Sequence, residues 1–382
     1  MESAVPLRVF HILSNPFIGG IEQLLSDLIP RFDPARCDMR IVNMRSESMA
    51  YDLWNQVGIR YHKLETPGKL LLGSVIGLAR LLRREKVDIV EIYGLRANII
   101  GRLAAKTAGV PVVITGVLST DDWRKWYHVW LDRATNWAVT GWIPNAYACE
   151  RSLMEREGYT AERIHVIYDG IDVSYWTRNP DPSVRSRFRK NWGYNEDNIV
   201  FVTVANLRLD KGVQFLIEAI PAVLQECAQA RFLLVGIDLM AGRLQDRCKQ
   251  LGIEHAVAFA GFRRDIRNIY EAADVAVLPS LREGLPICLI EAMSMELPVV
   301  ATWVSGTPEL VSDGDTGVLV PPGDVKVLTK ALITMTSSAE QRGQMGQAAR
   351  NRVCTMFAID RMIEELLDYY QRQFRSVRRK DF

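Results

Sequence analysis

Several features that mark other classes of protein are missing from this 382-residue chain. No apolar run approaches the roughly 20 residues that a membrane-spanning helix needs. The most apolar stretch, Leu70 to Ala79, is about half as long. Met1 to Val5 lack the basic and apolar regions of a secretory signal. We therefore expect a cytoplasmic protein that does not cross a membrane.

Paired cysteines and acidic metal motifs are also missing. The six cysteines are scattered without a C-x-x-C pair, which is typical of reduced thiols rather than of disulfides or a zinc site. No Asp-x-Asp follows a predicted strand, so we expect no metal site and no bound cofactor. The formal net charge is only +2, which gives no general attraction to nucleic acid.

What the chain does contain is a regular alternation of strand and helix patterns. A chain of this length exceeds the size at which a single core usually keeps growing, so two domains are expected. Alternation of this kind implies parallel sheets with right-handed crossovers. Strands of the first half are predicted at 8–13, 40–44, 59–63, 88–93, 110–115, 142–146 and 165–168.

A second alternating run follows the turn-rich segment Asp169 to Pro182, which we interpret as a hinge. Its strands are predicted at 199–205, 231–236, 257–261, 274–278, 298–302 and 317–320, and residues 339–378 read as helical. The fold class is therefore α/β, with two Rossmann-like domains. Ligands of such sheets bind beyond the carboxyl ends of the strands, and we expect the site in a cleft between the domains.

The most informative stretch runs from Leu278 to Pro298 and reads LPSLREGLPICLIEAMSMELP. It begins as the end of a buried strand, turns at Gly284 and Pro286, and continues as a helix from Ile287. The backbone N–H groups near Leu285 would then point out of a helix N-terminus, where anions bind.

Two carboxylates bracket this turn, Glu283 before the helix and Glu291 two helical turns later. A carboxylate that faces a pocket from a helix can accept both hydroxyl hydrogens of a diol such as ribose. A second segment, NLRLDKG at Asn206 to Gly212, also follows a buried strand, and it adds Arg208 and Lys211. A diphosphate is the natural ligand of such a cationic pair.

Glu283-x7-Glu291, followed by PVVAT, GTPELV and GDTGVLVPPGD, resembles the donor-site signature of the retaining family 4 (group 1) glycosyltransferases, which have the GT-B fold. The segment around Lys211 resembles that family's GRL…KG element, whose Arg and Lys hold the donor diphosphate. Asn206 stands where the family has arginine, and Arg208 lies two residues further on. Whether Arg208 takes over that role is a hypothesis.

The resemblance extends to other loops. Gly19 and Gly20 resemble the family's GG loop, which touches donor phosphate and acceptor. Gly236 resembles the first glycine of the VGxG turn, with Asp238 in place of the second, and Arg263 lies in a loop resembling the one against the nucleotide base. The resemblance implies donor contacts at these further positions: Gly284, Leu285, Pro286, Ile287 and Glu291.

The first domain departs from the family pattern. Related enzymes often have a histidine soon after the strand predicted at 110–115, and here none occurs before His128. The polar residues that could take its place are Ser119, Thr120, Asp121 and Asp122. The sequence does not choose among them.

Tryptophans interleaved with basic residues fill the segment from Trp123 to Trp142. Trp126, Trp130 and Trp137 fall roughly on one helical face, a pattern typical of helices in a bilayer interface. A core helix that forms one wall of an acceptor pocket would show the same pattern. Peripheral contact with an anionic membrane and a lipid-linked acceptor are the consequences of the first interpretation.

These observations and the resemblance together imply a retaining, metal-independent hexosyltransferase that uses a nucleotide diphosphate sugar. It would act on a glycan or lipid-linked acceptor in polysaccharide or glycolipid assembly, without a nucleic-acid partner. Residues 1–172, with the C-terminal helix of 358–382 crossing back, would bind acceptor, and residues 173–357 would bind donor. Lys211, Arg208 and helix amides would stabilise the leaving diphosphate, and Glu283 would hold the sugar.

Three alternatives remain open on the sequence. A nucleotide-sugar epimerase of the same fold would need an acid/base pair, for which the chain offers no convincing histidine. An NAD-binding protein is disfavoured because no G-x-G-x-x-G follows the first strand of either domain. A catalytically degenerate partner of an active transferase is supported only by the missing first-domain histidine.

Overall fold

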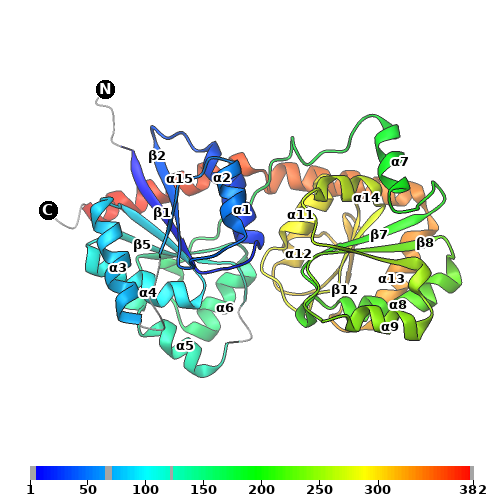
Figure 1. The fold of residues 1–382 in the computed structure, drawn as a ribbon, viewed down its shortest axis with the longest axis horizontal. Helices are drawn as coiled ribbons and strands as arrows, with labels where there is room; N and C mark the ends of the chain where they lie inside the picture. Colours follow the sequence, from blue (N-terminus) through cyan, green and yellow to red (C-terminus); the bar gives the residue numbers. More distant parts are fainter. Residues whose placement is uncertain (1–5, 65–70, 121–123, 379–382) are drawn as a thin grey trace. The chain divides into compact units, whose positions relative to one another are not determined.

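The computed structural model describes residues 6–64, 71–120 and 124–378. These residues form two compact units (Figure 1). The first contains the described residues up to Gly170 together with those from Ile359 onward, and the second runs from Ile171 to Ala358. Each unit is described by itself.

The described part of the first unit contains one parallel sheet of six strands in the order β3-β2-β1-β4-β5-β6. The strands are β1 (Leu7–Leu13), β2 (Cys37–Asn43), β3 (Tyr61–Lys63), β4 (Ile89–Tyr93), β5 (Val112–Val117) and β6 (Gly141–Pro144). The helices are α1 (Gly20–Leu28), α2 (Ala50–Gln56), α3 (Leu71–Arg84), α4 (Leu95–Ala108), α5 (Trp126–Arg133), α6 (Tyr147–Glu157) and α15 (Ile359–Arg378).

The described second unit repeats this topology, with six parallel strands in the order β12-β11-β10-β7-β8-β9. The strands are β7 (Ile199–Val204), β8 (Ala230–Val235), β9 (Val257–Gly261), β10 (Val275–Leu278), β11 (Val299–Thr302) and β12 (Gly317–Val320). The helices are α7 (Pro182–Lys190), α8 (Val213–Glu226), α9 (Arg243–Leu251), α10 (Ile266–Ala272), α11 (Ile287–Ser294), α12 (Thr307–Leu310), α13 (Val325–Ser337) and α14 (Ala339–Met356).

Apolar, β-branched strands explain why these sheets are buried on both faces. The β4 residues Ile89, Val90 and Ile92 are fully buried, and helices cover each sheet on both faces (Figure 1). Strand order reverses direction between β1 and β4 in the first unit and between β7 and β10 in the second. Doubly wound sheets bind ligands at such switch points, so the loops after these four strands are the candidate ligand-binding loops.

The predicted α/β class with two Rossmann-like domains is confirmed, and helix α15 belongs to the first unit as predicted. The strand predicted at 165–168 is wrong. That segment runs beside β6, where the His165 and Ile167 N–H groups bond the carbonyls of Trp142 and Pro144 at 3.0 and 3.1 Å, but it extends no ladder. The predicted helical region 339–378 is two helices, which end and begin around Phe357 and Ala358.

Candidate functional site

In the second unit the loops after β7 and β10 meet through an ion pair. The Lys211 ammonium lies 2.7 Å from the Glu283 carboxylate, whose Oε1 also accepts a hydrogen bond from the Ser280 hydroxyl at 2.6 Å. The two charged side chains are mostly buried, at 18 and 9 % exposure. Two of the residues predicted to act on the donor therefore lie in direct contact at the switch point of the sheet.

A glycine makes this contact possible. Gly212 follows Lys211 with φ of 66°, and a Cβ at this position would lie 1.8 Å from the Pro279 carbonyl oxygen. The Leu281 N–H donates to the Asp210 carbonyl at 2.8 Å, which ties the same two loops together. The β7 loop can approach the β10 loop this closely only because residue 212 has no side chain.

Immediately after Glu283 the chain turns into α11. Pro286 is the N-cap of this helix in an extended conformation, and the first intrahelical bond runs from Leu289 N–H to its carbonyl at 2.9 Å. The amides of Ile287 and Cys288 precede that bond and belong to the positive end of the helix. The Gly284 carbonyl accepts from Gly306 N–H at 3.0 Å, which fixes the turn.

Glu291 lies further along α11 and is 8 % exposed. Burial raises the pKa of Tyr270 well above its usual range, and the nearby charge of Glu291 adds to this effect. The Tyr270 hydroxyl also donates to the Cys288 carbonyl at 2.8 Å. Glu283 and Glu291 thus both belong to one segment, and both are largely withdrawn from solvent.

The remaining predicted donor residues lie on the same edge of the sheet but play visible structural roles. Asn206 Oδ1 accepts from the Ile237 N–H at 3.2 Å and joins the β7 loop to the β8 loop. Gly236, with φ of 144°, sits so close to Ala205 that a Cβ would lie 2.0 Å from its carbonyl oxygen. Asp238 accepts from the N–H groups of Met240 and Gly242 ahead of α9.

Two predicted cations are engaged locally. Arg208 is about half exposed and pairs with Asp210 on its own turn at 3.0 Å. Arg263 pairs with Asp265 at 2.8 Å and follows β9, which is two strands away from β7. The structure therefore brings Lys211, rather than either arginine, onto Glu283, and the donor roles of Arg208 and Arg263 stay predictions.

In the first unit Gly19 and Gly20 begin α1. The Gly19 N–H donates to Glu22 Oε2 at 2.8 Å, and Glu22 is completely buried. Burial raises the pKa of this carboxyl above its ordinary value, and the hydrogen bond from Gly19 opposes part of that effect. The glycine pair therefore places a buried acid beside the carboxyl end of β1.

A pocket of about 300 Å³ opens next to this acid, at the carboxyl ends of β1, β4 and β5. Its lining combines small polar side chains with apolar and aromatic ones; among the residues are Asn15, Glu22, Tyr93, Asn98, Ser119, Thr120 and Trp142. Buried polar atoms of this lining that have no hydrogen-bond partner among the described residues include Ser14 Oγ, Glu22 Oε1, Asn98 Oδ1 and Trp142 Nε1. Because buried polar groups are normally satisfied, the pocket is suited to a ligand that carries hydroxyl groups.

A buried ionic network forms the back of this pocket. Arg102 Nη1 lies 3.0 Å from Asp132 Oδ1, and Arg124 Nη1 lies 3.0 Å from Glu157 Oε1 and 3.4 Å from Asp132 Oδ2. These residues come from α4, α5, α6 and the chain just before α5. Their positions in the sequence follow no motif, so this network could not be predicted from the sequence.

The residues considered in place of the missing histidine divide into two groups. Ser119 and Thr120 line the pocket, whereas Asp121 and Asp122 lie outside the described residues, as does Trp123. His128 Nδ1 accepts from the Lys125 N–H at the start of α5. Among residues 6–64, 71–120 and 124–378 no three His, Cys, Asp or Glu side chains are grouped as metal ligands would be.

Two family models match most of the chain. The model described as Glycosyltransferase Family 4 matches residues 18–175, and the one described as Glycosyl transferases group 1 matches residues 184–352. The second match contains both the Lys211 loop and the Glu283 turn.

Individual proteins agree with these models. A putative glycosyltransferase, EpsD of Bacillus subtilis, is 28 % identical over 77 % of this chain and 78 % of its own length. A UDP-Gal:alpha-D-GlcNAc-diphosphoundecaprenol alpha-1,3-galactosyltransferase of Escherichia coli is 27 % identical over 95 % of this chain and 96 % of its own. The crystal structure of HepE from Anabaena in complex with UDP and glucose shares the fold, with a TM-score of 0.85, 22 % identity and coverage of 96 and 99 %. This chain belongs to the family 4 (group 1) glycosyltransferases, enzymes of the GT-B fold.

Proposed function

We propose that the enzyme transfers a hexosyl group from a nucleotide diphosphate sugar to a hydroxyl group of a glycan or lipid-linked acceptor. The anomeric configuration is retained, no metal ion takes part, and the reaction belongs to polysaccharide or glycolipid assembly. The reaction takes place in the cytoplasm, in keeping with the six free cysteines of the chain.

The observation that carries this proposal is the Lys211–Glu283 pair beside the first turn of α11. A diphosphate competes with Glu283 for the ammonium of Lys211 and gains the amides of Ile287 and Cys288. Glu283, released in this way, is available to accept hydroxyl hydrogens of the sugar. Breaking the one ion pair thus frees Lys211 for the diphosphate of the donor and Glu283 for its sugar.

The chemistry asks little of the protein beyond charge stabilisation. The bond between the anomeric carbon and the diphosphate oxygen breaks, and its electron pair stays with the diphosphate. The acceptor oxygen forms the new bond on the same face and passes its proton to the departing diphosphate oxygen. Lys211 and the α11 amides stabilise the leaving charge, and the Glu283 carboxylate complements the positive ring.

The acceptor side of the proposal rests on the pocket of the first unit. Its unpartnered Glu22 and Asn98 oxygens can accept hydrogen bonds from sugar hydroxyls, and Tyr93 and Trp142 offer apolar ring surface. The Escherichia coli relative is named for a diphosphoundecaprenol acceptor and a UDP-sugar, which supports a lipid-linked acceptor at a membrane surface here.

A panel of UDP-, GDP- and ADP-sugars tests the proposal by thermal shift and by turnover. We expect one donor to raise the melting temperature and to be consumed with an acceptor, because a ligand of the native state stabilises it. Lys211→Ala should lower kcat/KM by about 10²- to 10³-fold. Lys330→Ala, which removes an exposed lysine from α13, is the matched control.

Further readouts test the finer claims. The anomeric proton coupling of the product reports retention, and activity in excess EDTA reports metal independence. A protein that binds a donor but neither transfers nor hydrolyses it would support a degenerate partner and contradict the enzyme. An inverted product, or activity abolished by EDTA, would contradict the mechanism.

A further inference from the structure

The outer side of α5 exposes large aromatic side chains. Trp126 is 81 % exposed, Trp130 64 % and Trp137, in the 3₁₀ turn after the helix, 66 %. Leu131 is exposed between them. We call these four residues the tryptophan patch. Single exposed aromatics are ordinary, but three tryptophans within twelve residues form a contiguous apolar area.

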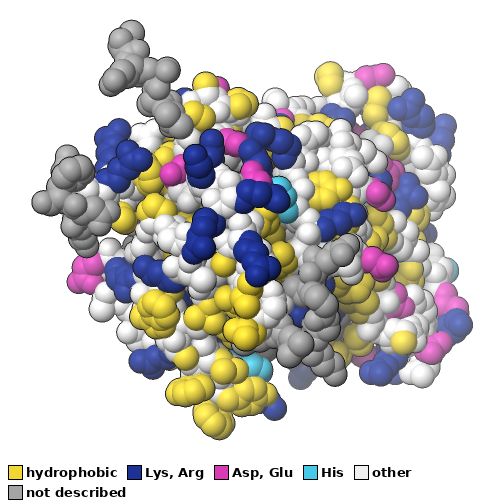
Figure 2. All heavy atoms as spheres, turned by 60° about the vertical axis from the view of Figure 1, so that its left-hand side comes forward, with side chains coloured by type: hydrophobic (Ala, Val, Ile, Leu, Met, Phe, Trp, Pro, Cys, Tyr) yellow, Lys and Arg dark blue, Asp and Glu magenta, His cyan; other side chains and the backbone are white. Residues whose placement is uncertain are grey.

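The patch continues across neighbouring helices. Helix α4 packs against both α5 and α3, so the three helices form one layer over the sheet. The exposed stripe of α3 begins with Leu72 and Ile76 and continues with Arg80 and Arg83. Figure 2 shows hydrophobic side chains gathered at the lower end of the first unit, the level of α5 in Figure 1, with Lys and Arg side chains above them.

The same layer has cations and almost no acids. Residues 71–84, 95–108 and 124–138 contain one carboxylate, Asp132, and its side chain is buried against Arg102 at 3 % exposure. Glu85, directly after α3, pairs with Arg40 and Arg84. The exposed cations of these segments are Arg80, Arg83, Arg84, Arg96, Lys106, Lys125 and Arg133.

The inner side of α5 explains why the tryptophans face outward. Asp132 accepts hydrogen bonds from Arg102 and from Asn98 Nδ2, at 3.0 and 3.3 Å, and so fixes the rotation of the helix about its axis. Turning the aromatic side inward would place Arg102 without its counter-charge in the interior, which is costly. The exposure of the patch is therefore built into the fold.

We propose that the outer surface of α3, α4 and α5 docks on an anionic lipid bilayer, with the tryptophan patch in the interface. Tryptophan favours the boundary between headgroups and acyl chains, and basic residues beside it are attracted to anionic lipids. Single-stranded nucleic acid also binds cations and aromatic rings. The aliphatic Leu72, Ile76 and Leu131 favour the bilayer, because they offer no ring on which a base can stack.

Nothing in this docking requires the donor, so it can be tested without the transfer reaction. Among the described residues no helix is long and apolar enough to cross a bilayer. The contact is therefore of the kind made by helices that lie on a membrane.

Flotation with vesicles of phosphatidylcholine and 30 % phosphatidylglycerol, against phosphatidylcholine alone, tests the proposal. We expect the full chain to float with the anionic vesicles, to be released by salt, and to show quenching of tryptophan fluorescence by brominated lipid. The triple variant Trp126→Ser, Trp130→Ser, Trp137→Ser should bind at least about tenfold more weakly. Trp303→Ser, which removes a tryptophan of similar exposure from the second unit, should bind as the parent does.

The charge contribution has its own pair of variants. Arg80→Gln with Lys106→Gln should weaken binding about 25-fold, since each cation near the surface contributes a factor of about five. The control variant combines Lys249→Gln with Lys330→Gln, which removes two exposed lysines of the second unit and should leave vesicle binding unchanged. Unchanged thermal unfolding shows that the variants are folded.

Failure of the chain to float with anionic vesicles would overturn the proposal, and so would a tryptophan variant that floats as well as the parent. Two other occupants of the patch would also contradict it. A dimer that the tryptophan variant abolishes would indicate a second copy, and tight binding of an oligonucleotide would indicate nucleic acid.

Discussion

Lys211 and Glu283 lie 72 positions apart, yet their charged groups touch because a single backbone position allows it. Gly212 combines a left-handed conformation with contact to the Pro279 carbonyl. Both residues were predicted to bind the donor from sequence motifs. The reason they can meet is a close approach of two loops, which no local pattern reports.

A comparison of Gly212→Ala with Gly252→Ala separates the effect of the left-handed conformation from the effect of the close contact between the loops. The φ angles are 66° and 68°, but a Cβ at Gly252 meets nothing within 4 Å, whereas one at Gly212 lies 1.8 Å from an oxygen. We expect Gly252→Ala to lower the free energy of unfolding by about 1 kcal/mol through the left-handed conformation alone. Gly212→Ala should cost about 1–3 kcal/mol more, because the loops must separate.

Donor turnover and chemical denaturation measure the two effects. Gly212→Ala should also lose most of its activity, because Lys211 is displaced from Glu283, while Gly252→Ala should keep it. Equal stability losses in the two variants would show that the close approach is not needed.

Only some of the polar residues that line the first-unit pocket could be predicted from the sequence. Ser119 and Thr120 were predicted as candidates because they follow a strand, and both line the pocket. Arg124 and Glu157 were not, since they are 33 positions apart in segments with no shared spacing. Ion pairs between distant segments depend on how helices pack, which a single sequence does not encode locally.

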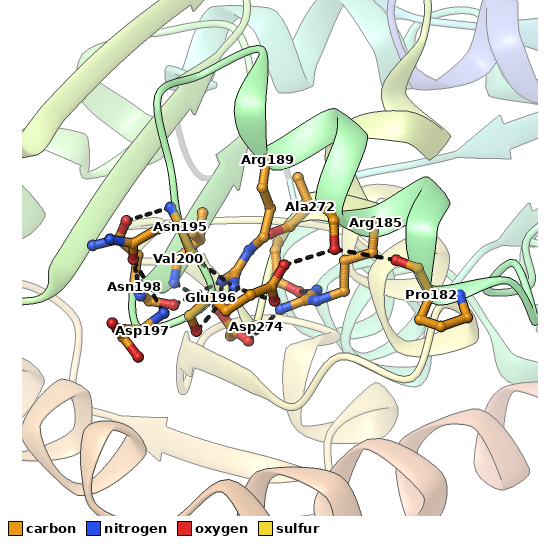
Figure 3. Close-up of polar contacts among 12 residues, drawn as sticks. Pro182, Arg185, Arg189, Asn195, Glu196, Asp197, Asn198, Val200, Ala272 and Asp274 are labelled. Atoms are coloured by element: carbon orange, nitrogen blue, oxygen red, sulfur yellow. Dashed lines mark hydrogen bonds and ion pairs between the residues drawn. The ribbon is translucent and has the colours of Figure 1, made fainter.

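At the scale of elements, the strands could be predicted well because buried parallel strands are apolar and β-branched. Helix α7 was not predicted. Its sequence, PSVRSRFRK, has the composition of a solvated charged segment. In the structure two of its arginines, Arg185 and Arg189, turn toward Asp274 at the beginning of β10 (Figure 3).

The α7 contact is unusually well satisfied. Arg189 is 2 % exposed; it bonds Asp274 Oδ2 at 2.6 Å and the carbonyls of Ala272 and Asn198 (Figure 3). Asp274 Oδ2 also accepts from the Val200 N–H at 2.7 Å, so one carboxylate joins α7, β7 and β10. Burial lowers the pKa of Arg189, and the charge of Asp274 opposes that effect.

Arg189→Leu should therefore destabilise the second unit by about 3–5 kcal/mol, because Asp274 and several carbonyls lose a buried partner. Arg187→Leu makes the same change two positions earlier, at an exposed site on the same helix, and should cost less than about 0.5 kcal/mol. Urea unfolding followed by circular dichroism compares them. Similar midpoints for the two variants would mean that α7 is not anchored through Arg189.

The sequence left two interpretations of helix α5 open. The tryptophan pattern was compatible with a bilayer surface and with a pocket wall. The structure places Asp132 in the pocket lining and exposes Trp126 and Trp130 on the opposite side. The geometry is compatible with both interpretations, and each of them stays a prediction.

At the scale of the whole molecule, the end of the chain completes the first unit. Helix α15 packs against β5, and its Tyr370 hydroxyl donates to the Glu91 carboxylate of β4, which is 279 positions earlier. The return of this helix to the first domain was expected from the family resemblance. The hydrogen bond from this helix to a buried carboxyl group could not be predicted from the sequence.

Glu91 and Asp169 make the stability of this arrangement depend on pH. Burial raises the pKa of each carboxyl to about 7, although hydrogen bonds from Tyr370 and from Asn145 partly oppose it. Their ordinary values are 4.5 and 3.8, so between those values and about 7 the folded state holds protons that the unfolded state has lost. Each group therefore lowers the free energy of unfolding as the pH rises toward 7.

Glu91→Gln should remove this dependence at one of the two groups. The amide oxygen can still accept from Tyr370 but cannot ionise, so the variant should gain on the order of 2 kcal/mol relative to the parent between pH 5 and pH 8. Thermal or urea unfolding at the two pH values measures the difference, with Glu155→Gln on the exposed side of α6 as the control. A variant whose stability relative to the parent is the same at both pH values would show that Glu91 does not titrate in the native chain over this range, and that the junction with α15 is insensitive to pH.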